Sequence, residues 1–257
     1  MNYDKSRLLV RLAETPEEVR AAQRLRYRVF VEEMGAPAVE ADHEARLELD
    51  RFDPVFDHLV LIDQSVDEPL DRVVGAYRLL TSDKAHSNFG FYGASEYDLT
   101  PIEKLGRKSL ELGRSCVAKD YRGGAAMHLL WNGLADYVLR REIEILFGVA
   151  SFHGTDPTEI APALSLLHHD HLAPADLRVK ALGESTIDMN LMPRDQIDQK
   201  DAMKQIPPLI KAYLRLGGFV GQDAYIDHDF NTIDVCLLVD TTRMVSRYRD
   251  YYEKQAS

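Results

Sequence analysis

Short apolar segments alternate with polar turns along most of the chain, and their lengths and spacing predict both strands and helices. Strands are expected at residues 8–12, 58–62, 72–80, 109–117, 143–149, 219–226 and 233–239. Helices are expected at residues 15–34, from about 125 to 141, around 162–167, at 207–216 and at 244–254. Several antiparallel strands therefore precede a strand–helix–strand unit, which predicts a mixed α/β sheet rather than a purely parallel one.

Two of the expected helices carry specific local signals. In the first, Thr15 can cap the helix, Pro16 suits the first helical position and Glu18 occupies the capping-box position. The helix after residue 124 has an apolar stripe at helical spacing, formed by Met127, Leu130, Trp131, Leu134 and Val138. Both helices should therefore pack one face against the sheet.

Composition narrows the class of protein. The 257 residues carry a net charge of −11, which argues against a nucleic-acid binder because such proteins normally present a basic surface. Cys116 and Cys236 are the only cysteines, so no disulfide framework is indicated. No secretory signal is recognised near the N-terminus, and no apolar run is long enough to span a membrane. A cytoplasmic location is expected.

One strand carries a pair of charged residues that could do chemistry. Glu111 and Arg114 are three residues apart and would face opposite sides of a regular strand. Gly113 lies between them and is a plausible position for a β-bulge, which could turn both side chains toward one face. A carboxylate and a guanidinium brought together could accept a proton from an amine and bind an anion. The alternative is an ordinary ion pair on a half-exposed strand.

The loop after this strand has the features of an anion site. Lys119, Arg122, Gly123, Gly124 and Ala125 lie between a strand and the start of a helix, where free backbone amides attract a phosphate group. A pyrophosphate or a phosphopantetheine phosphate would fit there. The alternative is a simple strand–helix turn.

Further charged residues come in a characteristic order: Arg26 with Phe30, Asp50 with Asp53, Gly75 with Arg78, and Glu111 with Arg114. This order and spacing resemble the acyl-homoserine-lactone synthases, which have a GNAT-like fold. A sister family, the ornithine–acyl carrier protein N-acyltransferases, is similar over most of the length. The similar segments are LRYRVFVEEMGA (25–36), ELGRSCVAKDYR (111–122), LLWNGLADYVLR (129–140), GVASFHGTDP (148–157), PPLIKAYLRLGGFVG (207–221) and DVCLLVD (234–240).

The resemblance implies a fold and a reaction. The fold would be a single GNAT-like α/β (α+β) domain over residues 1–257, with a mostly antiparallel sheet splayed at a bulge around Gly113 and a helical insertion at about 153–205. The reaction would transfer a 3-hydroxyacyl group from acyl carrier protein to the α-amine of L-ornithine, giving lyso-ornithine lipid. The amine would attack the thioester directly. Acyl-phosphopantetheine would be a co-substrate, with no bound cofactor and no metal.

The resemblance also implies roles for individual residues. Glu111 would be the base, directly or through a water, and Arg114 would orient Glu111 or bind the ornithine carboxylate. Asp50 would join them at the catalytic centre. The other candidates are Arg26, Phe30, Asp53, Arg78, His153 and Asp156 for the substrates, with Cys116, Val117, Lys119, Arg122, Gly123, Gly124 and Ala125 for the acyl-phosphopantetheine arm.

Several of these roles have alternatives. Asp50 and Asp53 could hold the δ-amine of ornithine, and Arg26 with Phe30 could close the donor side. Asp156 could instead cap a helix that begins at Pro157. Three neighbouring histidines are too tightly spaced to supply three metal ligands from one regular element; they are His168, His169 and His171.

The loop at Arg122 departs from the usual GNAT phosphate loop, because Ala and Met stand where glycines normally lie. This favours a carrier-protein arm over the pyrophosphate of coenzyme A. An acidic carrier protein would need a basic surface, for which there are two candidate groups: Lys119, Arg122, Arg140 and Arg141, or Arg20, Arg24 and Arg28.

Two other functions stay open: an acyl-homoserine-lactone synthase that uses S-adenosylmethionine, and a non-catalytic acyl or carrier-protein binding module. Because the implied product is a lipid, peripheral contact with the cytoplasmic face of the inner membrane is also considered, through the helix expected at 244–254.

Overall fold

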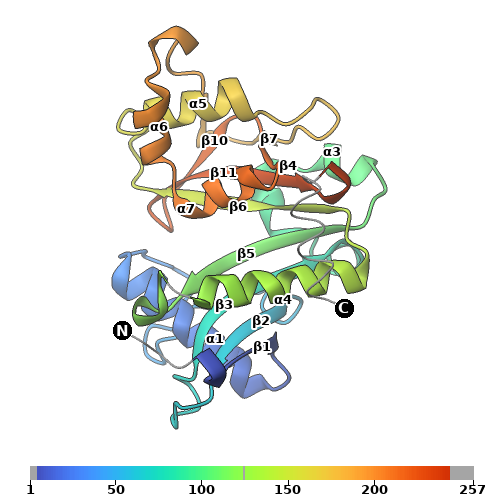
Figure 1. Ribbon diagram of the computed structural model, residues 1–257, viewed down its shortest axis with the longest axis vertical. Helices are drawn as coiled ribbons and strands as arrows, with labels where there is room; N and C mark the ends of the chain where they lie inside the picture. The colour runs from blue at the N-terminus through green and yellow to red at the C-terminus, as the bar shows by residue number, and fades with distance from the viewer. Residues whose placement is uncertain (1–4, 124, 244–257) are drawn as a thin grey trace. The chain divides into compact units, whose positions relative to one another are not determined.

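The computed structural model describes residues 5–123 and 125–243, which form two compact units. The first unit contains residues 5–89, 112–123 and 125–142, and the second contains residues 90–111 and 143–243. Strand β5 (Ser109–Val117) begins in the second unit and ends in the first. Figure 1 traces the helices and strands of both units.

The first unit is built on antiparallel strands. β1 (Leu8–Leu12) pairs with β2 (Asp57–Asp63), which pairs with β3 (Val73–Thr81), and β5 follows next to β3. The helices of this unit are α1 (Pro16–Arg26), the short α2 (Ser82–His86) and α4 (Ala125–Arg141). As predicted, Thr15 caps α1 by accepting a hydrogen bond from the backbone N–H of Glu18.

Alternate side chains along the strands point to opposite faces of the sheet, and each face is covered by an apolar layer. Val60 and Ile62 belong to the core under α1, in a cluster with Ala21, Ala22, Leu25, Val29, Val73, Ala76 and Cys116. The intervening side chains face α4, where a Cβ at Gly75 would lie 2.8 Å from Cδ1 of Leu130. A Cβ at Gly133 of α4 would likewise meet Cγ2 of Val10 at 2.8 Å. Glycine at these two positions therefore lets α4 approach the strands closely.

The second unit combines one parallel pair with antiparallel pairs. Residues Ser109–Glu111 of β5 run parallel to the start of β6 (Ile145–His153), and β6 pairs antiparallel with β11 (Thr232–Asp240). The sheet continues through β10 (Ala224–Asp227) to β8 (Thr186–Ile187), with β9 (Phe219–Val220) also paired to β11. The remaining elements are β4 (Tyr97–Asp98), paired with β7 (Lys180–Ala181), and helices α3 (Thr100–Lys104), α5 (Ala161–His171), α6 (Gln199–Gln205) and α7 (Pro208–Arg215). The predicted mixed, mostly antiparallel sheet is confirmed.

Most of the predicted elements differ from the structure only at their ends, but two differ in kind. The helix expected to reach about Met34 is α-helical only to Arg26 and then continues as a π-helical segment, Tyr27–Glu33. The strand expected at 219–226 is interrupted between β9 and β10. Five positions separate Val220 from Tyr225, but only three separate their partners in β11, Leu237 and Asp234, so two residues must loop out.

The helix expected at 244–254 lies outside the described residues. Within the described part of the chain, no helix has both the length and the apolar character needed to cross a bilayer.

Candidate functional site

The first unit contains a buried cluster of charged side chains, centred on Arg26 at the end of α1. Its guanidinium donates from Nη1 and Nη2 to Oδ1 and Oδ2 of Asp53, at 2.9 and 2.8 Å. Gln23, one helical turn earlier, donates to Oδ2 of Asp53 at 2.9 Å. Arg26 and Asp53 are both buried, so each depends on the other for compensation of its charge.

Arg78 on β3 extends this cluster. Its Nη1 donates to Oδ2 of Asp50 at 2.7 Å and to Oδ1 of Asp53 at 3.1 Å. Its guanidinium carbon also lies 4.5 Å from the centre of the Phe56 ring, a cation–π contact. Four residues that were singled out from the sequence, Arg26, Asp50, Asp53 and Arg78, therefore lie together in one cluster.

Glu48 is a further member, which the sequence analysis missed. Its Oε2 accepts from Nε of Arg26 at 2.5 Å, and its Oε1 accepts from Nε of Arg114 at 3.0 Å. Nη2 of Arg114 also lies 3.8 Å from Oδ2 of Asp50. Three arginines thus face three carboxylates. The only available signal in the sequence was a carboxylate two positions before Asp50, in the segment Leu47-Glu48-Leu49-Asp50.

The arginines keep two of these carboxylates, Glu48 and Asp53, ionised. Burial alone would raise the pKa of Glu48, but the nearby Arg26 and Arg114 outweigh it and lower that pKa to about 2. Burial also opposes ionisation of Asp53, yet Arg26 and Arg78 hold the pKa of Asp53 well below its ordinary value. Glu48 and Asp53 are therefore ionised at neutral pH.

Arg114 has an unusual backbone. Its φ is 48°, in the left-handed region that residues other than glycine rarely adopt. The bulge was predicted at Gly113. The backbone departs from a regular strand one residue later, at Arg114. Because the backbone turns here, the simple rule that residues three apart face opposite sides no longer applies to Glu111 and Arg114.

Glu111 lies in the part of β5 that belongs to the second unit, and its side chain is buried. Its Oε2 accepts from the backbone N–H of Tyr92 at 2.8 Å, and its Oε1 accepts from that of Gly93 at 2.6 Å. A Cβ at Gly93 would lie 2.9 Å from Oε1, so glycine leaves the space for this contact. The two N–H groups fix the carboxylate in place.

The candidates for the pantetheine arm are in two different environments. Cys116 and Val117 are buried, and burial raises the pKa of the Cys116 thiol to about 12, so the thiol is protonated at neutral pH. Lys119 and Arg122 are exposed. Arg122 donates from Nε to the carbonyl of Val117 at 2.9 Å and from Nη2 to Oε2 of Glu33 at 2.7 Å.

The turn into α4 has room beside its backbone. Gly123 has a φ of 73°, and a Cβ there would have no atom within 4 Å. Ala125 is the first residue of α4, and Gly124 lies outside the described residues. The backbone at Gly123 is therefore open to close approach by another group.

The remaining candidates for substrate binding are dispersed. Phe30 lies in the π-helical segment and packs against the core under α1. His153 ends β6 and is exposed. Asp156 is exposed and accepts from the backbone N–H and the hydroxyl of Thr158, so it caps the turn before α5. No described helix begins at Pro157.

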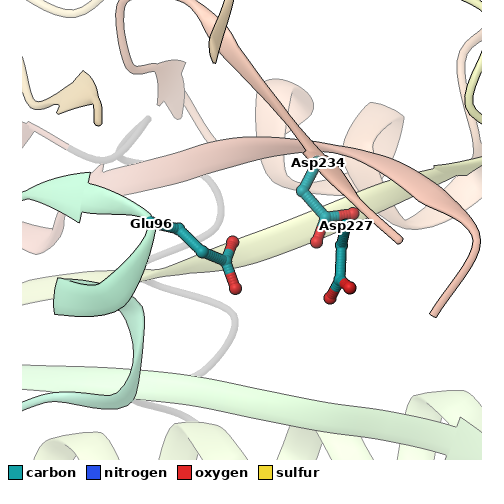
Figure 2. A group of neighbouring side chains, drawn as sticks. All are labelled: Glu96, Asp227 and Asp234. Carbon is teal, nitrogen blue, oxygen red and sulfur yellow. The ribbon is translucent and has the colours of Figure 1, made fainter. Parts of the chain in front are cut away.

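A second group of acidic side chains lies in the second unit. Figure 2 shows Glu96, Asp227 of β10 and Asp234 of β11 turned toward one another, with one carboxylate oxygen from each within 4.8 Å of the others. Such spacing could hold a cation, although acidic groups often gather without one. Of the three histidines, His169 contacts the carbonyl of Met192 at 3.0 Å, and His168 and His169 form an edge-to-face pair.

Comparison with known proteins decides the family. The chain is 57% identical to an L-ornithine Nα-acyltransferase of Rhodobacter capsulatus, over 96% of this chain and 95% of the relative. The chain belongs to the family of L-ornithine Nα-acyltransferases. A second member, from Brucella abortus, is 43% identical over 97% of this chain and 90% of the relative. The family and the enzyme class expected from the sequence are confirmed.

The fold comparison agrees with this family. Residues 25–132 match the model of an acetyltransferase (GNAT) domain. Among solved structures, an N-acyl amino acid synthase from uncultured soil microbes has a TM-score of 0.51 and 14% identity, over 92% of each chain. A coenzyme A-dependent acyl-homoserine lactone synthase has a TM-score of 0.50 and 17% identity, over 94% of this chain and 83% of that one. These likenesses confirm the GNAT-like fold of this ornithine acyltransferase.

Proposed function

We propose that this ornithine acyltransferase moves a 3-hydroxyacyl group from the phosphopantetheine thioester of acyl carrier protein to the α-amine of L-ornithine, giving lyso-ornithine lipid. The observation that carries the acceptor and the bond formed is the 57% identity, over nearly the whole chain, to a relative with that activity. We also propose the identity of the acyl donor and the roles of individual residues.

Arg114 is proposed to bind the α-carboxylate of ornithine. A guanidinium suits this task because its N–H groups match the two oxygens of a carboxylate. Asp50 stays the candidate for the δ-ammonium. Asp53 is proposed to act indirectly, because both of its carboxylate oxygens already accept hydrogen bonds from Arg26, and it also accepts from Arg78.

Glu111 is proposed to take the proton from the α-amine, directly or through a water. The neutral amine attacks the thioester carbon, a C–N bond forms, and the C–S bond breaks. The nitrogen loses two protons in all: the first is the one that Glu111 takes from the ammonium group, and the second is lost as the C–N bond forms and protonates the released thiolate, which leaves as the thiol. The support is a buried carboxylate held in one orientation by the N–H groups of Tyr92 and Gly93.

The donor arm is proposed to run along β5 beyond Arg114, toward the turn that contains Arg122 and Gly123. The exposed charge of Lys119 and Arg122 suits a single phosphodiester. An acyl carrier protein donor would restrict the reaction to the cytoplasm, and an amphiphilic product would leave through the inner membrane, so we propose peripheral contact with that membrane.

The proposal is tested by measuring release of the carrier-protein thiol with four acceptors: L-ornithine, L-lysine, glycine and S-adenosylmethionine. Mass spectrometry of the product identifies the amide, and a matched acyl-coenzyme A tests the donor. We expect an ornithine amide from the 3-hydroxyacyl carrier protein, at a much lower rate from acyl-coenzyme A. Absence of any amino-acid amide would contradict the acceptor, and equal use of both donors would contradict the donor.

A further inference from the structure

Glu48 connects two arginines that are distant in the sequence. One of its carboxylate oxygens accepts from Nε of Arg26 at 2.5 Å and the other from Nε of Arg114 at 3.0 Å. Its side chain is only 3% exposed. A carboxylate that accepts from two guanidinium groups inside the protein is constrained in both position and orientation.

The backbone of Glu48 is held as firmly as its side chain. Its N–H donates to the carbonyl of Gln23 at 3.1 Å, and its own carbonyl accepts from Nη2 of Arg26 at 2.6 Å. Arg26 is in turn fixed by its paired hydrogen bonds to Asp53. Glu48 is therefore a rigid support for the guanidinium of Arg114.

Arg114 needs such a support. Its left-handed φ of 48° is costly for a residue with a long side chain, and such conformations persist where the surroundings hold them. Its side chain is 12% exposed, which makes it the most accessible of the cluster's three arginines. A salt bridge through Nε sets the plane of the guanidinium and hence the directions of its terminal N–H groups.

We propose that Glu48 is a positioning residue for the acylation of ornithine: through Nε of Arg114 it orients the guanidinium that binds the α-carboxylate of the acceptor. This inference rests on the proposed function, in which Arg114 takes that carboxylate. Recognition of the ornithine carboxylate would then depend on Glu48, which does not itself touch the substrate.

The test compares two acceptors in one preparation: L-ornithine, and L-ornithinamide, which lacks the carboxylate charge. For Glu48→Gln we expect KM for ornithine to rise about 10- to 100-fold, the effect of losing a hydrogen bond to a charged group, with a smaller change in kcat. The kcat/KM for ornithinamide should change little. Because the ratio of the two kcat/KM values is taken within one sample, any unfolded fraction cancels.

Three variants sharpen this test. Glu48→Asp keeps the charge but is one methylene shorter, so it should restore part of the preference for ornithine. In an Arg114→Ala background, Glu48→Gln should leave the ratio unchanged, because the group that it orients is gone. Glu44→Gln, at an exposed position in the same segment, should behave like the wild type.

The possible failures are distinguishable. If Glu48→Gln lowers kcat/KM equally for both acceptors, its role is merely structural and the inference is overturned. If the wild type does not prefer ornithine to ornithinamide, the carboxylate role of Arg114 fails, and the inference with it. Formation of no ornithine amide by the wild type would instead contradict the proposed function itself.

Discussion

Arg26 and Asp53 form a two-pronged ion pair inside the first unit, with Nη1 to Oδ1 at 2.9 Å and Nη2 to Oδ2 at 2.8 Å. The two residues are 27 positions apart, and both are buried. Asp53 also accepts hydrogen bonds from Arg78 and Gln23. Its carboxylate therefore connects α1 and β3 to the segment before β2. This ion pair anchors the cluster, because it fixes Arg26, which in turn binds Glu48 next to Arg114.

Removing this anchor should destabilise the fold. We expect Asp53→Asn to lower the free energy of unfolding by about 3–5 kcal/mol, because it leaves buried guanidinium charge uncompensated. Urea titration followed by circular dichroism measures this change. The control is Glu32→Gln, which breaks a more exposed ion pair with Arg46 and should cost about 1 kcal/mol or less. Equal losses for the two variants would contradict the anchoring role.

Stability should fall in acid partly because of Glu48. Its pKa is lowered from 4.5 to about 2 in the folded protein, so its contribution is present above pH 4.5 and is lost as the pH falls toward 2. The contribution at neutral pH is roughly 3 kcal/mol, at 1.36 kcal/mol for each pH unit. Thermal melts from pH 6 to pH 2.5 should show the gap between the wild type and Glu48→Gln narrowing as the pH falls. A gap that stays constant or widens would rule out this linkage.

Glu111→Gln should impair turnover more than binding. Loss of a general base typically costs about 100- to 10,000-fold in rate, so we expect kcat to fall by at least about 100-fold, with a modest change in KM for ornithine. Steady-state kinetics at saturating ornithine measures the effect, and a melting curve shows whether the variant is folded. The exposed Glu184→Gln, in the same unit, is the control. Wild-type turnover by Glu111→Gln would refute the assignment of the base.

Two glycines should respond differently to alanine. At Gly75 a Cβ would lie 2.8 Å from Leu130 and 3.3 Å from Leu61, so we expect Gly75→Ala to cost about 1–3 kcal/mol through overpacking. At Gly113 the nearest atoms would be Nε of Arg78 at 3.9 Å and a ring carbon of Phe56 at 4.0 Å, which is ordinary contact. Gly113→Ala should therefore change the melting temperature little. A larger loss at Gly113 than at Gly75 would show that the strand requires glycine next to Arg114.

Most of the fold was predictable because its signals are local. The strands at 8–12 and 109–117 agree with the structure residue for residue, and the helix cap at Thr15 is as expected. Alternation along a strand and capping at a helix end depend on neighbours within a few positions, which the sequence displays directly. The interruption between β9 and β10 was not predictable, since it arises from their register against β11, a different part of the chain.

For the site, the sequence by itself determined the family and pointed to Arg26, Asp50, Asp53 and Arg78, because their order and spacing resemble those of known acyltransferases. Only the tertiary structure decided how these residues act on one another. It brings in Glu48, which is 66 positions from Arg114, and it assigns the two oxygens of Glu111 to the N–H groups of Tyr92 and Gly93. These contacts depend on which buried side chains meet when distant segments pack, and on the backbone turn at Arg114. Neither the packing nor the turn has a local signature in the sequence.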